Sequence, residues 1–380
     1  MNKSLLMAIT ACAAMAMTSC SSEDLTSGTT QANETPISFS TYLGRAAESR
    51  ASVISGGVPS FGVFAFYTGK DTWDNYASKT TPNFMNNQEV TGTSTTENTT
   101  TTWTYEYSPL KYWPNNADDK ISFFAYAPYQ SGTQFAEDGT GSSKDYKVSF
   151  TVDNNVKNQI DRLYAIALTD KTKQNIGDKV KFEFKHALSR IGFQVAYAAD
   201  GTTQGNTKID GKTKITLSKV VLHKAGGSVT EGVFYKSGAM SLYKNTVTTT
   251  KAGNQVQTVT LDKNNFVGGN DFTVTNEYQQ LNANDSYIMV IPIDLSASDG
   301  GFDVTVTYTV TTEDSNLPEE KSEITNTITN TAHVSFEQGK AYTLKLLLGM
   351  TSVKIDAAST TWDSEETTVN LPANTTTASN

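Results

Sequence analysis

The stretch PISFSTYL, residues 36 to 43, decides the fold class. Its apolar or β-branched residues occupy every second position, and proline, serine and tyrosine occupy the positions between them. Ile37, Phe39 and Thr41 lie on one side of this pattern, with serine and tyrosine at the positions between them and Gly44 after it. A period of two is that of a β-strand with one face in a core. We therefore predict a strand over residues 36 to 43, interrupted at Gly44.

Short runs of the same kind recur along the chain. Thr, Ser, Asn, Tyr, Phe and Gly are abundant, and almost no stretch has apolar residues at helical spacing, so we predict an all-β protein. Further strands are expected at residues 61–67, 105–112, 121–126, 146–152, 163–168, 180–184, 191–197, 214–223, 232–242, 256–261, 287–293, 302–310, 341–348, 353–357 and 367–371.

The length of the chain and its turn residues predict two sandwich domains. Without its first 19 residues the chain keeps enough sequence for two domains of ordinary size. The turn-rich stretch NIGD, residues 175 to 178, is the expected boundary. It divides a first domain, residues 36–176, from a second domain, residues 177–357, which a tail over 358–380 follows. The polar run TGTSTTENTTTT, residues 91–102, is expected to be a loop or a hairpin tip.

The N-terminus has the pattern of an export signal. Residues 1–19 combine Lys3, an apolar run too short to span a bilayer, and small residues directly before Cys20. Cys20 is the expected lipid attachment site, and the polar residues 20–35 are a tether. An ordinary secretory leader with an incidental Cys20 is the alternative. Because Cys12 lies inside the leader, the exported chain can form no internal disulfide.

Composition and spacing argue against several classes of function. The net charge is −9, and Lys and Arg are scattered among a larger number of acidic residues, so we expect no nucleic-acid partner. The three histidines, His186, His223 and His333, are dispersed, and no catalytic or phosphate-binding motif occurs. We predict no enzyme activity, no cofactor and no metal site.

Aromatic residues leave a second functional hypothesis open. Trp73, Trp103, Trp113 and many of the tyrosines could stack on sugar rings, as in a surface lipoprotein that binds glycans. In a β-sandwich the same side chains are more often core residues or cross-strand partners. A hydrolase is a weaker third alternative, since a sandwich can carry any chemistry.

Two of the four arginines of the chain lie close together after the first strand. Arg45 and Arg50 belong to GRAAESRA, residues 44–51, a small and polar link of the kind that proteases cut. A surface loop with two ordinary charges is the alternative. After a cut, the first strand would be held only by ladder hydrogen bonds and by Ile37 and Phe39. Its loss would open an apolar groove that a strand of another molecule could fill.

Taken together, the motifs resemble the fimbrillin family, the subunits of type V pili of Bacteroidales, over nearly the whole chain. The resemblance rests on MTSC before the tether, PISFSTYLGRA, FGVFAFY, LKYWP, ISFFAYAP, VKFEFKHALSRIGFQV, SYIMVIP and KAYTLKLLLGMTSVKIDA. It implies two tandem transthyretin-like Greek-key β-sandwich domains. It also implies a structural or adhesive pilus subunit that is exported as an acylated lipoprotein, and CSSED resembles a signal for the outer face of the outer membrane.

The resemblance further implies how subunits would join. An arginine-specific protease would cut after Arg45 or Arg50, and the strand that carries Ile37, Phe39 and Thr41 would leave. A strand of a neighbouring pilus subunit would replace it, supplied by Val353 and Ile355 or by Val369 and Leu371. Whether the chain is a shaft, tip or anchor subunit, and whether it binds a glycan or a host-surface ligand, stays open.

Overall fold

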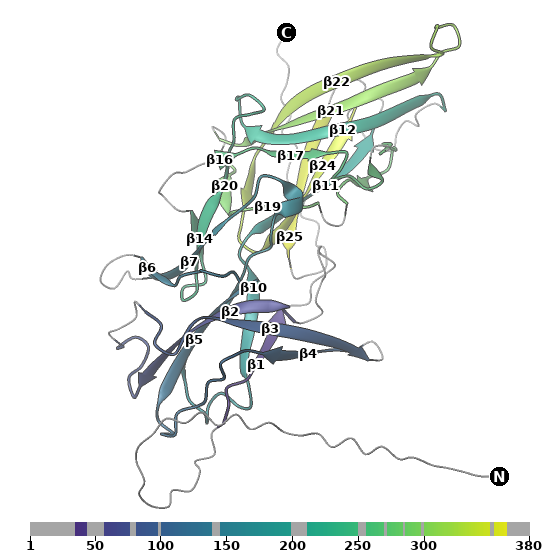
Figure 1. Cartoon of the computed structure of the whole chain (residues 1–380). Helices are drawn as coiled ribbons and strands as arrows, with labels where there is room; N and C mark the ends of the chain where they lie inside the picture. Colours follow the sequence, from purple (N-terminus) through teal and green to yellow (C-terminus); the bar gives the residue numbers. More distant parts are fainter. Residues whose placement is uncertain are drawn as a thin grey trace, which may run out of the picture. The chain divides into compact units, whose positions relative to one another are not determined.

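The computed structural model describes residues 35–43, 57–76, 81–97, 100–138, 145–198, 211–249, 256–269, 272–283, 286–297, 300–349 and 353–362. In these ranges the regular structure is almost entirely β-strand, and it includes the short 3₁₀ helix η2 (Val156–Asn158) (Figure 1). The prediction of an all-β protein is confirmed. None of the helical structure in these ranges is long and apolar enough to cross a membrane.

The first sheet has eight strands, and its central strands are buried on both faces. Its order is β1 (Phe39–Leu43), β10 (Val180–His186), β8 (Leu163–Ala165), β5 (Lys120–Ala127), β2 (Ser60–Gly69), β3 (Met85–Glu97) and β4 (Thr100–Glu106), with β9 (Leu168–Lys171) beside β5. Along β2, Phe61 and Val63 face one core cluster, and Phe64 and Phe66 face another. This double burial explains why β2 and β5 are continuously apolar rather than alternating.

Two further sheets enclose the largest core. One contains β18 (Gln279–Gln280), β11 (Ser189–Tyr197), β24 (Lys340–Leu348) and β25 (Val353–Thr361), with β19 (Ile288–Val290) beside β11. The other contains β17 (Val259–Asp262), β12 (Thr213–Lys224), β21 (Phe302–Glu313) and β22 (Lys321–Ala332). Alternate residues of β21, such as Val304, Val306 and Tyr308, pack in one cluster with Leu344 and Leu346 of β24. The two sheets therefore form a sandwich.

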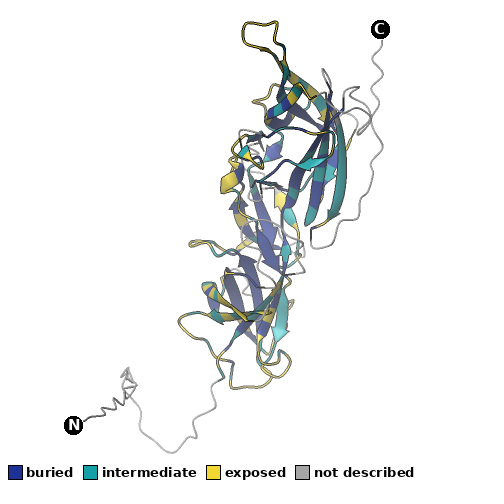
Figure 2. Ribbon diagram, turned by 90° about the vertical axis from the view of Figure 1, so that its right-hand side faces the viewer, coloured by how far each residue is buried: buried dark blue, intermediate teal, exposed yellow. Residues whose placement is uncertain are grey.

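Smaller sheets complete the described fold. They contain β15 (Val247–Thr249), β14 (Ser237–Ser241), β7 (Asp145–Thr151) and β6 (Ala136–Asp138); β13 (Phe234–Tyr235) and β16 (Val256–Gln257); and β20 (Ile293–Leu295) and β23 (Val334–Phe336). Figure 2 shows buried residues along the middle of the sheets and exposed residues on loops and hairpin ends.

Two sequence-based predictions of secondary structure differ from the structure, and some strands were not predicted. Residues 91–102 belong to a hairpin, as one of the two readings expected, but they are mostly strand rather than loop, because β3 and β4 pair from Thr91↔Glu106 to Glu97↔Thr100. The expected strand at 105–112 ends with β4 at Glu106. The twelve residues of β22 form a strand that the sequence did not predict. In both missed regions threonine ladders pair strands whose outer faces bury little.

The division into two domains at residue 176 stays a prediction, as does their Greek-key topology. The first sheet continues beyond that point, since β10 pairs with β1 on one side and β8 on the other. Side chains also meet across the expected boundary: the rings of Trp73 and Tyr243 lie 6.1 Å apart in one buried cluster.

Candidate functional site

Strand β1 is an edge strand whose inward side chains belong to the core. Phe39 is 2% exposed, and Leu43 packs against the same core cluster; Ile37, two residues before the strand, is 1% exposed in that cluster. Tyr42 points the other way and is 42% exposed. The alternation in the sequence therefore corresponds to one buried and one open face, as predicted.

The backbone of this segment pairs with two different parts of the chain. Residues 39 to 43 run parallel to β10, with Phe39 opposite Val180 and Leu43 opposite Phe184. Just before them, Ile37 N donates to Lys111 O over 2.8 Å, and Trp113 N donates to Thr35 O over 3.0 Å. Because β10 is the sole strand partner of β1 among the described residues, a ladder on one side holds β1 in its sheet.

Phe39 fills an aromatic pocket. Its ring lies 5.7 Å from that of Phe182, stacked, and 5.3 Å from that of Tyr107. Phe61 at 6.0 Å and Phe123 at 6.4 Å present their rings at right angles to it. Edge-to-face and stacked contacts of this kind stabilise a core beyond the area that they bury. Without Phe39, these four rings would line an apolar groove.

Two tyrosines close the other side of the groove. The Tyr105 hydroxyl forms a hydrogen bond with the Thr41 hydroxyl, and the Tyr107 hydroxyl donates to Ile37 O over 2.8 Å. Burial is the largest cause that raises the pKa of each phenol, so both remain protonated and able to donate. Neither tyrosine was predicted from the sequence to be part of the site. Their signal is the alternation Trp103, Tyr105, Tyr107 at a spacing of two.

Some of the site residues predicted from the sequence lie in the described part of the chain, and some lie outside it. Phe39 and Thr41 lie in β1, and Ile37 lies two residues before it in the same core cluster as Phe39. Cys20, Arg45, Arg50, Val369 and Leu371 lie outside the described residues. In the sequence, Arg45 comes two residues after the last residue of β1.

Val353 and Ile355 lie in β25, which is a full member of its own sheet. β25 pairs with β24 without interruption from Leu348↔Val353 to Lys340↔Thr361. Val353 is 6% exposed, and Ile355 packs against the largest core. Donation of this strand to another molecule would break all of these pairs.

Trp362 anchors the end of β25. It is 1% exposed, and its backbone N–H donates to Gly339 O over 3.1 Å. Its ring stacks on that of His186, with centroids 3.9 Å apart and planes at 3°. The guanidinium of Arg190 lies 5.4 Å from the same ring, and His186 Nδ1 lies 2.7 Å from Asp161 Oδ2. The point where the C-terminal tail begins is thereby fixed beside the end of β10.

Two of the three tryptophans considered for sugar stacking are core residues. Trp73 is 1% exposed and Trp113 is 7% exposed. Trp103 is half-buried, because its ring lies 6.2 Å from that of Tyr105 and covers Gly57. None of these three tryptophans is therefore an open aromatic platform, while Tyr42, Tyr67 and Tyr112 are exposed.

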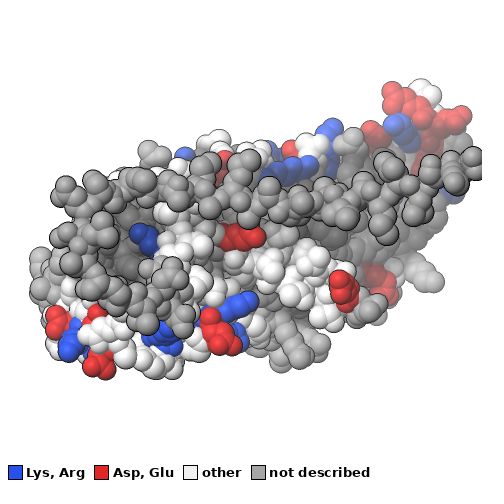
Figure 3. Space-filling model, turned by 60° about the horizontal axis from the view of Figure 1, so that its bottom comes forward, with Lys and Arg blue, Asp and Glu red and all other residues white. Residues whose placement is uncertain are grey.

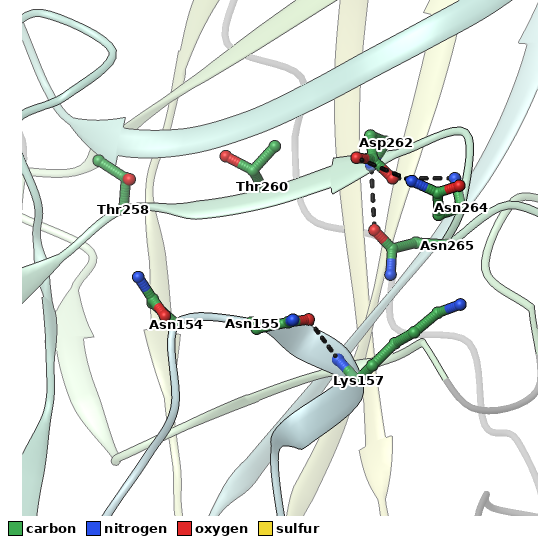
Figure 4. A pocket seen from close by; sticks show the side chains of 8 residues that line it. All are labelled: Asn154, Asn155, Lys157, Thr258, Thr260, Asp262, Asn264 and Asn265. Atoms are coloured by element: carbon green, nitrogen blue, oxygen red, sulfur yellow. Dashed lines mark hydrogen bonds between the residues drawn. The ribbon is translucent and has the colours of Figure 1, made fainter.

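An open polar hollow of about 510 Å³ lies beside β17 and η2 (Figure 4). It is lined by Asn154, Asn155, Lys157, Thr258, Thr260, Asp262, Asn264 and Asn265. Several of these groups stabilise local turns, since Asn155 Oδ1 accepts from Lys157 N and Asp262 Oδ1 accepts from Asn264 N. The lining contains no aromatic ring, so the hollow lacks a stacking surface for sugars.

Charged side chains of both signs are visible on one face of the described residues (Figure 3). On the face in Figure 3, the basic and acidic side chains of the described residues are interspersed. Among the described residues, no group of three or more His, Cys, Asp and Glu side chains is placed to hold a metal ion.

Comparisons with known proteins all lead to fimbrial proteins. Residues 45–363 match the family model described as Fimbrillin-like. Fimbrium subunit Fim1C of Phocaeicola vulgatus is 26% identical over 383 aligned residues, which cover 93% of this chain and 94% of that protein. The crystal structure of a fimbrial protein from Bacteroides vulgatus has a TM-score of 0.61 at 21% identity, covering 86% of this chain and 99% of that one.

Proposed function

The chain belongs to the Fimbrillin-like family, and on that premise we propose that it is a subunit of a surface fimbria that polymerises by exchange of β1. Members of this family are structural subunits of fimbriae rather than enzymes, so a structural or adhesive role at the cell surface follows. Export as a lipoprotein, proteolytic cutting and strand exchange are the further steps of the proposal.

The observation that carries the proposal is the way in which β1 is held. It is an edge strand with one described strand partner, yet it fills an apolar groove with Ile37 and Phe39. Burial of side chains of this size stabilises a fold by about 1.5 to 3 kcal/mol each. A groove that loses both is a strong acceptor for another apolar strand, and the edge of β10 supplies the backbone partners.

Cutting after Arg45 or Arg50 would separate β1 from the rest of the chain. β1 ends at Leu43, so either cut leaves the whole strand on the N-terminal fragment together with Cys20. A lipid on Cys20 would hold the precursor at the outer membrane until the cut. Lipid and strand would then leave together.

The donor strand is better sought in residues 368–371 than in β25. Val353 and Ile355 would have to leave nine consecutive pairs with β24, and Trp362 fixes the end of the strand. Val369 and Leu371 follow Trp362 in sequence and alternate as a groove-filling strand requires. We therefore assign them the donor role in the neighbouring subunit.

Substitution of the two arginines tests this scheme. Arg45→Ala together with Arg50→Ala should leave uncut, unpolymerised precursor on cells, detected as a single band on a mildly denaturing gel. Arg162→Ala is unsuitable as a control, because Arg162 is buried. Lys70→Ala, at an exposed position beyond the link, is a suitable control and should leave a ladder of polymers. A polymer ladder from the double variant would contradict the proposed trigger.

A glycan-binding lipoprotein that does not polymerise is the alternative. It predicts that every molecule on the cell keeps Cys20 as its N-terminus. N-terminal sequencing of the surface protein separates the two functions, because the fimbrial scheme predicts Ala46 or Ala51 as the first residue.

A further inference from the structure

Strand β22 is a long and unprotected sheet edge. It pairs with β21 over twelve consecutive positions with no register shift, and no other described strand pairs with it (Figure 1). Edge strands are normally protected by proline, by charges or by bulges. β22 contains no proline, and its only charged residues, Lys321 and Glu323, lie at its beginning and bond each other over 2.8 Å.

The sequence of this edge is self-complementary. Residues 325 to 331 read TNTITNT, which is the same in both directions about Ile328. When two copies of such a strand pair antiparallel about a two-fold axis at the centre, identical residue types face each other throughout. Ile328 would face Ile328 of the second copy, with threonine opposite threonine and asparagine opposite asparagine on both sides.

On the outer face of β22, threonines already pair with threonines of β21, the one described strand beside it. The hydroxyls of Thr305 and Thr329 lie 2.7 Å apart, and those of Thr309 and Thr325 lie 3.1 Å apart. Thr307 and Thr327 form a third pair at 3.3 Å. Cross-strand threonine pairs stabilise a sheet. A second copy of β22 would extend this threonine ladder beyond the present edge.

The inner face of β22 also carries apolar surface, which the β22 strand of a second copy would cover. Ile328 is only partly buried against the largest core, and Ile324 is 58% exposed. Exposed apolar residues on an unpaired edge favour association.

We propose that β22 is a homophilic contact: two copies of the chain pair antiparallel through this strand, with Ile328 on the two-fold axis. The occupant is a second copy because the edge has unpaired backbone groups and a sequence that complements itself. The contact is separate from β1 and from strand exchange, so it would join subunits side by side. A single strand pair buries less than a standard interface, and we expect a dissociation constant on the order of 100 µM.

Cysteine scanning tests the register of this contact. In the full chain with Cys12→Ser and Cys20→Ser, single cysteines are placed at Asn326, Thr327, Ile328, Thr329 and Asn330, and disulfide-linked dimers are followed under mild oxidation. The Cβ atoms of directly opposite residues in a strand pair lie about 4.5 to 5.5 Å apart, and a small shift brings them to the distance that a disulfide needs. Ile328→Cys should therefore link fastest, and Thr258→Cys near the opposite edge of the same sheet should stay monomeric. No dimer with Ile328→Cys, or fastest linking at another position, would overturn the proposal.

A charge at the axis provides the second test. Ile328→Lys would place two lysines opposite each other, and like charges in that position destabilise a strand pair. In sedimentation equilibrium the dissociation constant should rise about tenfold or more relative to the parent chain. Thr258→Lys should leave it unchanged, and circular dichroism should show that both variants keep their strands. A parent chain that is monomeric at its highest soluble concentration would overturn the proposal, as would an Ile328→Lys variant that dimerises normally.

Discussion

Replacement of Phe39 by alanine tests whether β1 is a part of the core. Phe39 is 2% exposed, and four aromatic rings lie within 6.4 Å of its own ring. Truncation of a buried phenylalanine costs about 3 to 5 kcal/mol of unfolding free energy. Because β1 lies at a sheet edge and the groove can partly close, we expect Phe39→Ala to lower the free energy of unfolding by about 3 kcal/mol, near the lower end of that range.

Urea unfolding followed by tryptophan fluorescence measures this loss. Trp113 reports on the region, since its ring lies 5.9 Å from that of Phe123, which contacts Phe39. If the slope of the unfolding free energy against urea concentration is the same in the parent chain and in Phe39→Ala, the same cooperative unit unfolds in both. Tyr42→Ala is the matched control, because Tyr42 is on the open face of the same strand, 42% exposed, and should lose about 1 kcal/mol at most. A loss from Phe39→Ala no larger than that of the control would refute the assignment of β1 as a core element.

Three further predictions concern other parts of the fold. Asn282 is fully buried, accepts from Phe193 N and donates to Ser286 O, each over 2.6 Å, so Asn282→Ala should cost about 2 to 4 kcal/mol in urea unfolding. Trp362→Ala removes the stack on His186 and should cost about 3 kcal/mol; equal stability would show that the end of β25 is not anchored there. Burial raises the pKa of Tyr308 from 10.0 to about 12. The unfolded chain therefore releases this proton first, and stability should fall as pH rises from about 10 to about 12, less steeply in Tyr308→Phe.

The sequence was informative wherever one face of a strand is buried. The alternation in residues 36 to 43 predicted which side chains of this segment enter the core, and Ile37 and Phe39 are buried there. The continuous apolar runs of β2 and β5 were also recognised as strands. Their aromatic and β-branched composition reflects packing, which is what sequence patterns record best.

Pairing partners and polar strands were beyond the reach of this reasoning. Alternation in β1 carries no information about β10, which lies some 140 residues away and runs parallel to it. β22 was missed because threonine and asparagine fill it, and its stability comes from a ladder with β21 rather than from burial. The stack of Trp362 on His186 likewise depends on tertiary structure alone.

The mass of subunits taken from assembled surface polymer tests the central claim most directly. If β1 is exchanged, these subunits begin at Ala46 or Ala51, and no peptide that contains Ile37 and Phe39 is recovered from them after digestion. Polymer whose subunits still contain residues 36 to 43 would contradict the account, because β1 would then occupy the groove that a neighbouring strand is proposed to fill.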